Sequence, residues 1–198
     1  MKVSIVKYNA GNVFSVISAL KRLGVDLIYT DDIEVLRGSD CVVFPGQGEA
    51  SNAMSYLRAH GLDEVIRDLR QPVLGICIGQ QLLCRHSEEG DTDCLGVFDV
   101  DVRRFAPTLQ SDKIPAMGWN EIGDLRSPLF KDMDTSFVYF VHSYYVPLCE
   151  HTIATSDYIL PYSAAIHKDN FYATQFHPEK SGQAGEQILE NFLKIVRN

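Results

Sequence analysis

The sequence predicts an α/β fold in which a central, largely parallel or mixed sheet is flanked by helices. Strand-like and helix-like runs alternate through residues 1–85, and their continuous apolar strands are typical of parallel, doubly wound sheets. The second half is mostly strand-like, which indicates antiparallel or mixed strands beside the parallel ones. Because no linker, repeat or low-complexity segment interrupts the chain, one domain over residues 1–198 is expected.

The first half is expected to supply four strands with helices between them. The strands are predicted at residues 3–8, 26–30, 41–46 and 72–77. Residues 12–23 place apolar side chains on one helical face, and Gly24 stands where that helix should end. Two helical runs separated by Gly61 follow the third strand, and residues 79–86 are expected to form a helix after the fourth.

Strands dominate the second half. They are predicted at residues 95–105, 136–146, 151–159, 162–170 and 171–179. The run at residues 182–196 returns to helical periodicity through Ile188, Phe192 and Val196, so the domain should close with a helix.

Composition and charge exclude several function classes. The formal net charge is −8, and an acidic chain repels both phosphate backbones and anionic lipid surfaces, so neither nucleic acid nor a membrane is an expected partner. No run approaches the length of a membrane span, and no signal peptide is expected. The five cysteines form no C-x-x-C pair, which disfavours a disulfide framework or a zinc site. A cytoplasmic protein without metal or cofactor is expected.

The stretch "GICIG", residues 75–79, places a cysteine where a buried strand turns sharply into a helix. This is the thiol counterpart of the G-x-S-x-G nucleophile elbow, in which glycines remove side chains that would collide at the turn. Gly75 and Gly79 should therefore let Cys77 present its sulfur at the carboxyl end of the sheet. The position at a helix N-terminus also favours a thiolate, so Cys77 is the expected nucleophile.

A base for this nucleophile is expected within "QFHPEKS", residues 175–181. A thiol nucleophile needs a base within hydrogen-bond reach, and the base needs a third group that holds its tautomer. His177 can serve as the base and Glu179 as the group that orients it, since side chains two residues apart on an extended chain project to the same side. An H-x-E pair alone is a weak signal, but together with G-x-C-x-G it becomes strong.

Acyl transfer at such a site also requires an oxyanion hole. The amide of Ile78, directly after the nucleophile, is one natural donor. The second is expected from "FPGQGEA", residues 44–50, which ends the third predicted strand and is called the oxyanion turn below. Its amides near Gly46 and Gln47 are candidates, although the turn alone would equally suit an ordinary glycine turn.

These motifs resemble class I (triad) glutamine amidotransferases over essentially the whole chain. The resemblance rests on "YNAGN" (8–12), "LGICIGQQLL" (74–83), "SEEG" (87–90), "KIPAMGWN" (113–120), "YFVHSYYV" (139–146) and "ATQFHPEKSG" (173–182). It implies a flavodoxin-like glutaminase domain that hydrolyses glutamine to glutamate and ammonia. The implied catalytic triad is Cys77, His177 and Glu179.

The same resemblance implies roles outside the triad. The residues expected to hold glutamine are Gly46, Gln81, His142, Ser143 and Tyr144. Within the family, "GWN" together with "FVHSY" resembles glutaminase subunits that pass ammonia to a separate cyclase subunit with a (β/α)8 barrel. A heterodimer is therefore expected, with Trp119, Asn120 and Lys180 at interface or coupling positions.

Three positions depart from the family pattern, and none of them is a triad member. Gln47 stands where a small apolar residue is common, Gln80 where methionine is common, and Ala116 where histidine is common.

Other functions remain open from the sequence. The chain could be the glutaminase of another ammonia-using synthase, such as anthranilate synthase or a sugar-modifying enzyme. It could be a stand-alone γ-glutamyl hydrolase, which would turn over fully without a partner. A non-catalytic interaction subunit is the third alternative, and the intact triad argues against it.

Overall fold

A computed structural model describes residues 1–8, 11 and 13–197 and confirms the expected α/β fold. Its central sheet has seven strands in the order β11-β12-β13-β4-β3-β1-β2. The pairs that join β13, β4, β3, β1 and β2 are parallel, whereas β12 and β11 are added in antiparallel fashion at one edge. The sheet is therefore mixed, and the expected addition of antiparallel strands to a parallel sheet is confirmed.

The elements of the first half follow the predicted order. They are β1 (Lys2–Val6), α1 (Phe14–Arg22), β2 (Asp26–Thr30), α2 (Ile33–Arg37), β3 (Cys41–Phe44), α3 (Ala50–Ala59), α4 (Leu62–Asp68), β4 (Val73–Ile76) and α5 (Ile78–Leu83). The sequence missed α2, a five-residue helix whose start is capped by the Asp32 carboxylate. The predicted first helix reached back to Asn12, which lies outside the described residues, as do Asn9 and Ala10 of the "YNAGN" motif.

The helix predicted over residues 79–86 is wrong in its second half. The structure ends α5 at Leu83 and continues directly into strand β5 (Cys84–Ser87). The backbone N–H groups of Leu95 and Gly96 donate to the carbonyls of Leu82 and Cys84. These hydrogen bonds to a segment more than ten residues away hold residues 82–84 out of a continuing helix. Tertiary hydrogen bonding thus overrides the helical pattern.

The second half builds the antiparallel strands and two small sheets. Its elements are β6 (Thr92–Asp93), β7 (Phe98–Arg104), β8 (Ala116–Glu121), η1 (Pro128–Phe130), β9 (Phe137–His142), β10 (Tyr144–Tyr145), β11 (Thr152–Tyr158), β12 (Leu160–Lys168), β13 (Phe171–Thr174), η2 (Pro178–Lys180) and α6 (Gly182–Arg197). Strands β10, β7, β5 and β6 form one small sheet, and β8 pairs with β9 in the other. The sequence did not predict β8 as a strand.

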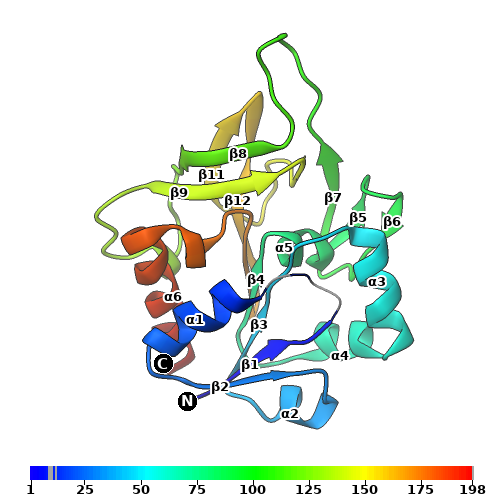
Figure 1. Cartoon of the computed structure of the whole chain (residues 1–198), viewed down its shortest axis with the longest axis vertical. Coiled ribbons are helices and arrows are strands. Elements are labelled where there is room, and N and C mark those ends of the chain that lie inside the picture. Colours follow the sequence, from blue (N-terminus) through cyan, green and yellow to red (C-terminus); the bar gives the residue numbers. More distant parts are fainter. Residues whose placement is uncertain (9–10, 12, 198) are drawn as a thin grey trace.

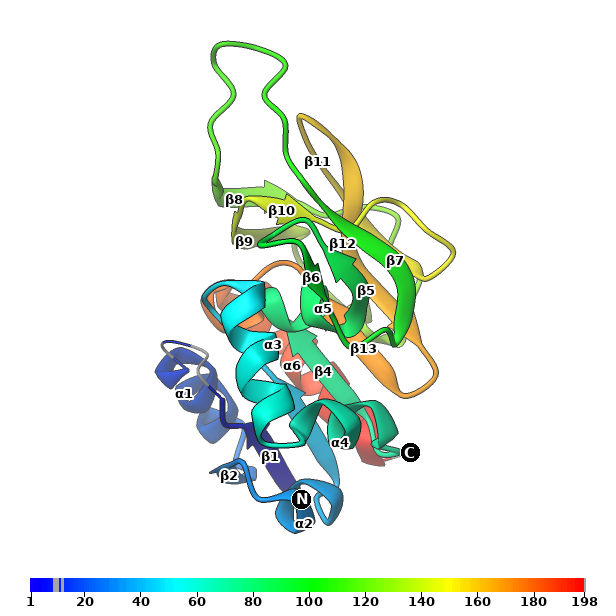
Figure 2. The same ribbon diagram turned by 90° about the vertical axis from the view of Figure 1, so that its right-hand side faces the viewer.

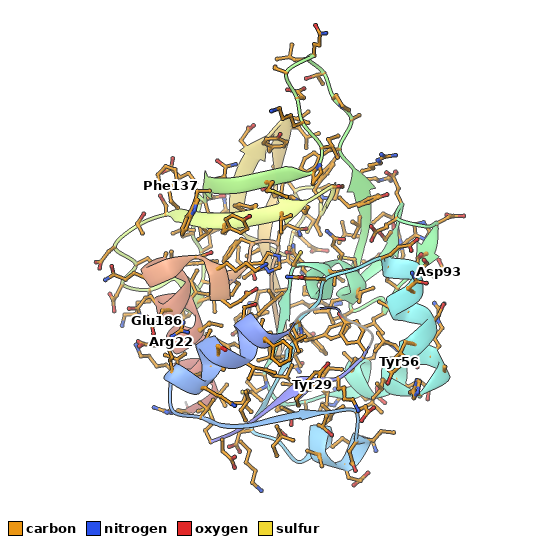
Figure 3. All side chains as sticks on the ribbon, in the orientation of Figure 1. Arg22, Tyr29, Tyr56, Asp93, Phe137 and Glu186 are labelled. Atoms are coloured by element: carbon orange, nitrogen blue, oxygen red, sulfur yellow. The ribbon has the colours of Figure 1, made fainter. Side chains whose placement is uncertain are left out.

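Helices cover both faces of the central sheet (Figure 1). Helices α1 and α6 pack on one face, where Leu20 and Phe192 join one hydrophobic core. Helices α3 and α4 pack on the other, where Met54 and Ile66 join a second core. The Arg22 guanidinium lies 4.0 Å from the Glu186 carboxylate, which ties α1 to α6 (Figure 3).

The β8–β9 ribbon crosses above the central sheet, and the segment between β7 and β8 projects beyond it as a long loop (Figure 2). This ribbon lies over the end of the sheet where β4 passes into α5. The carboxyl ends of the parallel strands therefore face a partly covered space.

Candidate active site

Cys77 occupies a strained turn between β4 and α5. Its backbone has φ 56° and ψ −109°, a conformation that side-chain-bearing residues rarely adopt and that clusters at functional sites. A Cβ atom on Gly79 would lie 1.9 Å from the Phe44 carbonyl oxygen, and one on Gly75 would lie 2.9 Å from the Leu83 side chain. Gly79 is therefore required by close approach to backbone, while a side chain at Gly75 would have to displace the Leu83 side chain.

His177 reaches Cys77 from the segment that follows the neighbouring strand β13. Strands β13 and β4 are parallel and pair Thr174 with Ile76, and the Cys77 N–H donates to the Thr174 carbonyl at 2.7 Å. Because the carboxyl ends of adjacent parallel strands meet at one edge of the sheet, residues far apart in sequence arrive side by side. The structure thus brings Cys77 and His177 together.

Glu179 contacts His177 through a tight turn rather than an extended strand. Pro178–Lys180 form the 3-10 turn η2, in which the Lys180 N–H donates to the His177 carbonyl at 3.0 Å. The Ser181 hydroxyl donates to the same carbonyl at 2.6 Å. This turn places Nδ1 of His177 2.8 Å from Oε1 of Glu179. The pairing was expected, but its geometry comes from the turn and not from strand alternation.

The charges around His177 favour its protonated form. Burial alone would lower the pKa of His177, but the adjacent Cys77 and the Glu179 carboxylate outweigh it and raise the pKa to about 10. Since Nδ1 faces Glu179, Nε2 is left for the nucleophile, and this buried atom has no hydrogen-bond partner among the described residues. The arrangement suits a thiolate–imidazolium pair, which can both attack a carbonyl carbon and protonate a leaving group.

A cavity of about 480 Å³ opens in front of Cys77. Its walls include six further residues that the sequence predicted for the site: Gln47, Ile78, Gln81, His142, Ser143 and Tyr144. Cys77 itself is 8 % exposed, so its sulfur is more enclosed than the sequence suggested. The cavity is large enough for a molecule the size of an amino acid.

Gly46 stands behind this cavity and is absent from its lining. A Cβ atom at this position would lie 2.0 Å from the Tyr8 hydroxyl and 2.2 Å from the Ile78 side chain. None of the hydrogen bonds formed between described residues uses the amide of Gly46 or Gln47. The oxyanion turn therefore lies directly against the elbow with amides that remain available.

His142 is held as a neutral imidazole. Its Nδ1 lies 2.7 Å from the Tyr144 carbonyl, which can only accept, so Nδ1 carries the proton. Burial, partly offset by this hydrogen bond, lowers the pKa of His142 to about 4. Its buried Nε2 has no partner among the described residues. His142 therefore presents an acceptor and cannot supply a positive charge near neutral pH.

The three predicted coupling residues lie at two places. Lys180 lies at the main cavity beside His177. Trp119 and Asn120 instead line a second hollow of about 240 Å³ together with Phe140 and Tyr162. The Asn120 amide is already engaged, since its Nδ2 donates to the Asp157 carbonyl at 2.9 Å.

Gln175 is a site residue that the sequence did not identify. This fully buried side chain accepts a hydrogen bond from Nε2 of Gln81 at 2.9 Å and directs its own Nε2 toward the Cys77 sulfur at 3.7 Å. It therefore links a substrate-binding candidate to the nucleophile. The available signal was its place two residues before His177.

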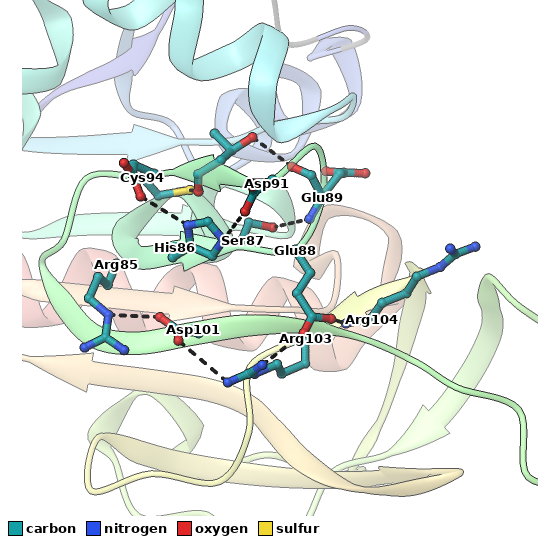
Figure 4. Close-up of polar contacts among 12 residues, drawn as sticks. Arg85, His86, Ser87, Glu88, Glu89, Asp91, Cys94, Asp101, Arg103 and Arg104 are labelled. Atoms are coloured by element: carbon teal, nitrogen blue, oxygen red, sulfur yellow. Dashed lines mark hydrogen bonds and ion pairs between the residues drawn. The ribbon is translucent and has the colours of Figure 1, made fainter.

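Glu89 was also missed, although "SEEG" was noted as a motif. Its carboxylate accepts from the Ala50 N–H at 2.9 Å at the start of α3, and it is the only carboxylate that lines the main cavity among the described residues. Its backbone is fixed by Ser87 and Thr92, whereas the preceding Glu88 binds Arg103 and the Arg104 backbone (Figure 4). Two adjacent glutamates thus face different parts of the molecule.

The described part of the chain holds neither a metal-binding cluster nor a membrane-spanning helix. Residues 1–8, 11 and 13–197 contain no group of three histidine, cysteine or acidic side chains arranged to hold a metal ion. No helix within these residues has the length and apolar character needed to cross a bilayer.

Comparison with known proteins gives a consistent assignment of family. The model of the class-I glutamine amidotransferase family matches residues 5–196. The imidazole glycerol phosphate synthase subunit HisH of Bacteroides thetaiotaomicron is 62 % identical over 98 % of this chain and 100 % of its own length. The protein of the same name from Idiomarina loihiensis is 43 % identical over 99 % of each chain.

Solved structures share the fold at low sequence identity. A glutamine amidotransferase superposes with a TM-score of 0.74 at 19 % identity, covering 99 % of both chains. PurLQS from Thermotoga maritima gives a TM-score of 0.69 at 15 % identity, covering 98 % of both chains.

Proposed function

The chain belongs to the class-I glutamine amidotransferase family, and on that premise we propose that it is the glutaminase subunit of imidazole glycerol phosphate synthase in histidine biosynthesis. One observation carries the chemistry: Cys77 stands at a nucleophile elbow beside His177, whose far nitrogen is bound by the buried Glu179. We propose that residues 1–198 act as one glutaminase domain.

The first half of the reaction forms a thioester. The Cys77 thiolate attacks the side-chain amide carbon of glutamine, and the carbonyl oxygen becomes an oxyanion that the Ile78 and Gln47 amides stabilise. When this intermediate collapses, the carbon–nitrogen bond breaks and protonated His177 gives its proton to the leaving ammonia. A γ-glutamyl thioester and a neutral imidazole remain.

The second half releases glutamate. Neutral His177 now takes a proton from a water molecule that attacks the thioester, and collapse of the second intermediate returns the thiolate and the imidazolium. Glu179 stabilises the imidazolium in both halves because its carboxylate stays 2.8 Å from Nδ1. Hydrolysis thus regenerates the starting protonation state.

Glutamine recognition is proposed to use both ends of the substrate. Glu89 is the cavity carboxylate that can pair with the α-ammonium group, and the neutral His142 can accept from the same group. Gln81, Ser143 and Tyr144 line the same cavity and can hold the α-carboxylate and the side-chain amide. Gly46 contributes by its backbone, since any side chain there would collide with Tyr8 and Ile78.

The ammonia acceptor is proposed to be a separate cyclase subunit with a (β/α)8 barrel. Free ammonia is largely protonated in neutral water and loses its nucleophilicity, so direct transfer across an interface preserves it. The β8–β9 ribbon beside the cavity exposes Met117, Trp119 and Phe137, which is 50 % exposed and projects outward (Figure 3). An exposed apolar ribbon next to a catalytic cavity, with Lys180 at the cavity, suits a partner surface.

The deciding experiment measures glutamate release from glutamine in three mixtures. These are the chain alone, the chain with the matching cyclase, and the chain with the cyclase and its ribonucleotide substrate. Strong stimulation only in the third mixture is expected, because activity without an acceptor would waste glutamine.

The other outcomes would each overturn part of the proposal. Full activity of the isolated chain would retain the triad chemistry but replace the synthase subunit with an independent hydrolase. No glutamate release in any of the three mixtures would contradict this partner and this pathway. Glutamine turnover with a different synthase subunit would then identify the correct partner.

A further inference from the structure

We infer that Tyr8 is a positioning residue for glutamine hydrolysis, whose hydroxyl holds the oxyanion turn against the nucleophile elbow. The inference rests on the proposed glutaminase function and adds a residue that does not touch the substrate. Tyr8 follows β1 and begins the "YNAGN" motif, to which neither the triad nor the cavity lining assigns a role.

The contact is a buried hydrogen bond onto the backbone of the turn. The Tyr8 hydroxyl donates to the Pro45 carbonyl at 2.6 Å, and Tyr8 is 5 % exposed. Its ring also packs on Phe44, with ring centroids 5.3 Å apart. Tyr8 therefore contacts the first two residues of the oxyanion turn. Its ring packs on Phe44, and its hydroxyl binds the carbonyl of Pro45.

The hydrogen bond fixes the peptide plane that leads into the oxyanion donors. In a trans peptide the carbonyl of Pro45 and the N–H of Gly46 point in opposite directions, so binding the carbonyl sets the direction of that N–H. Gly46 lies between the Tyr8 hydroxyl and the Ile78 side chain, where even a Cβ atom does not fit. The backbone ahead of Gln47 is thus held from both sides.

Gly48, the residue after Gln47, is less constrained. A Cβ atom on Gly48 would have no neighbour within 4 Å, and its φ of +136° lies where glycine is favoured. The Gln47 N–H belongs to the Gly46–Gln47 peptide, so Gly46 helps to set its direction, while the Gln47 carbonyl lies against Gly11, 3.2 Å from a Cβ atom placed on that glycine. The Tyr8 hydroxyl is the group that anchors Gly46 on the side away from the elbow.

The hydroxyl remains a donor across the working pH range. Burial, followed by the nearby Cys77 and Tyr29, raises the pKa of Tyr8 well above that of a free phenol. A phenol that stays protonated beside the nucleophile can keep donating its hydrogen bond to the Pro45 carbonyl. It does not exchange protons with the substrate. Loss of the hydroxyl should consequently lower the rate by the same factor at every pH.

The test is Tyr8→Phe, which keeps the ring on Phe44 and removes only the hydroxyl. Glutaminase kinetics would be measured with the cyclase in saturating excess and its ribonucleotide bound. We expect kcat to fall about tenfold with KM for glutamine unchanged, the pattern of an interaction used in the transition state. Hydrogen exchange of the peptide covering residues 41–50 should become faster.

A second readout separates positioning from a damaged elbow. Iodoacetamide alkylates a thiolate by displacement at carbon and develops no oxyanion, so its rate at Cys77 reports the elbow and His177 alone. We expect this rate, followed by mass spectrometry of the Cys77 peptide, to stay within about twofold of wild type. Parallel loss of alkylation and turnover would contradict the inference and indicate a general disturbance.

Tyr56→Phe is the matched control. The Tyr56 hydroxyl donates to the Asp31 carboxylate at 3.4 Å, and Tyr56 lines neither the main cavity nor the second hollow. Its kcat should match wild type. Equal kcat for Tyr8→Phe and wild type would overturn the role of Tyr8 and leave the glutaminase function standing, whereas absence of turnover in the wild-type complex would overturn both.

Discussion

Nδ1 of His177 lies 2.8 Å from Oε1 of Glu179, and both side chains are almost completely buried, at 2 % and 1 % exposure. A buried carboxylate without a positive partner would be strongly unfavourable, so the imidazolium and the carboxylate stabilise each other. The pair is positioned by the turn after β13 and not by either side chain alone. This relationship fixes which nitrogen of His177 faces Cys77.

Removing the carboxylate charge should cost less than removing the nucleophile. Cys77→Ala and His177→Ala are expected to abolish glutamine hydrolysis while the protein still folds. Glu179→Gln keeps a hydrogen-bond acceptor next to Nδ1 but loses the charge that stabilises the imidazolium, so a fall of about 100-fold in kcat is expected. Steady-state kinetics of the complex measure this, and a larger loss in Glu179→Gln than in Cys77→Ala would reverse the assigned roles.

Neutralising Glu89 should weaken glutamine binding rather than chemistry. Glu89→Gln retains an oxygen for the Ala50 N–H but loses the charge proposed to pair with the substrate ammonium. We expect KM for glutamine to rise about tenfold with kcat largely kept. Glu88→Gln is the matched control, since Glu88 binds Arg103 outside the cavity and its loss should leave KM unchanged. An unchanged KM in Glu89→Gln would remove Glu89 from the substrate site.

Gly79 has no room for a side chain, whereas some other glycines do. Gly79→Ala would place a methyl group 1.9 Å from the Phe44 carbonyl oxygen, so it should destabilise the fold by about 3 kcal/mol or more. Gly123→Ala has only Thr155 nearby, at 3.7 Å, and should be tolerated. Urea unfolding of both variants measures this, and equal stabilities would show that the elbow can relax around a side chain.

The sequence could predict the sharp turn at Cys77 and the pairing of His177 with Glu179 because their determinants are local. The spacing of Gly75, Cys77 and Gly79 encodes a steric requirement that the fold then satisfies. Strand β5 could not be predicted, because hydrogen bonds from Leu95 and Gly96 redirect a run that is helical in isolation. Sequence alone therefore predicted where the elbow lies but not where α5 ends.

Gln175 and Glu89 escaped prediction for a related reason. Gln175 meets Gln81 across 94 residues, and Glu89 meets Ala50 across 39, so each acquires its role only when distant segments pair. Glutamine and glutamate are also common surface residues, and nothing in their type marks them as buried or functional. For Gln175, the parallel pairing of β13 with β4 is what brings this residue next to the turn at Cys77.

Replacing Gln80 should stabilise the protein. Gln80 is fully buried, and its Oε1 has no hydrogen-bond partner among the described residues, while its Nε2 donates to the Ser163 carbonyl at 3.3 Å. Gln80→Met has a similar volume and removes the unpaired oxygen at the loss of one long hydrogen bond. We expect the free energy of unfolding to rise by about 1 kcal/mol, measured by urea denaturation. A less stable variant would mean that the Ser163 contact outweighs the unpaired oxygen.

The neutral His142 should make the fold sensitive to mild acid. Its pKa is lowered to about 4 in the folded protein, chiefly by burial, whereas an unfolded histidine titrates near its ordinary value of 6.5. A group with a lowered folded pKa takes up its proton first in the unfolded state, so its contribution to stability is complete above about pH 6.5 and is lost as the pH falls toward 4. From pH 7 to pH 5 this amounts to about 2 kcal/mol.

His177 contributes with the opposite sign, which makes a variant comparison necessary. Its folded pKa is raised to about 10, so its stabilising effect is complete below about pH 6.5 and declines as the pH rises toward 10. Urea unfolding of wild type and His142→Asn at pH 7 and pH 5 isolates the first effect, because His177 is common to both proteins. The variant should lose about 2 kcal/mol less than wild type over this interval. Equal losses would mean that His142 is already protonated in the folded protein at pH 5, contrary to its lowered pKa.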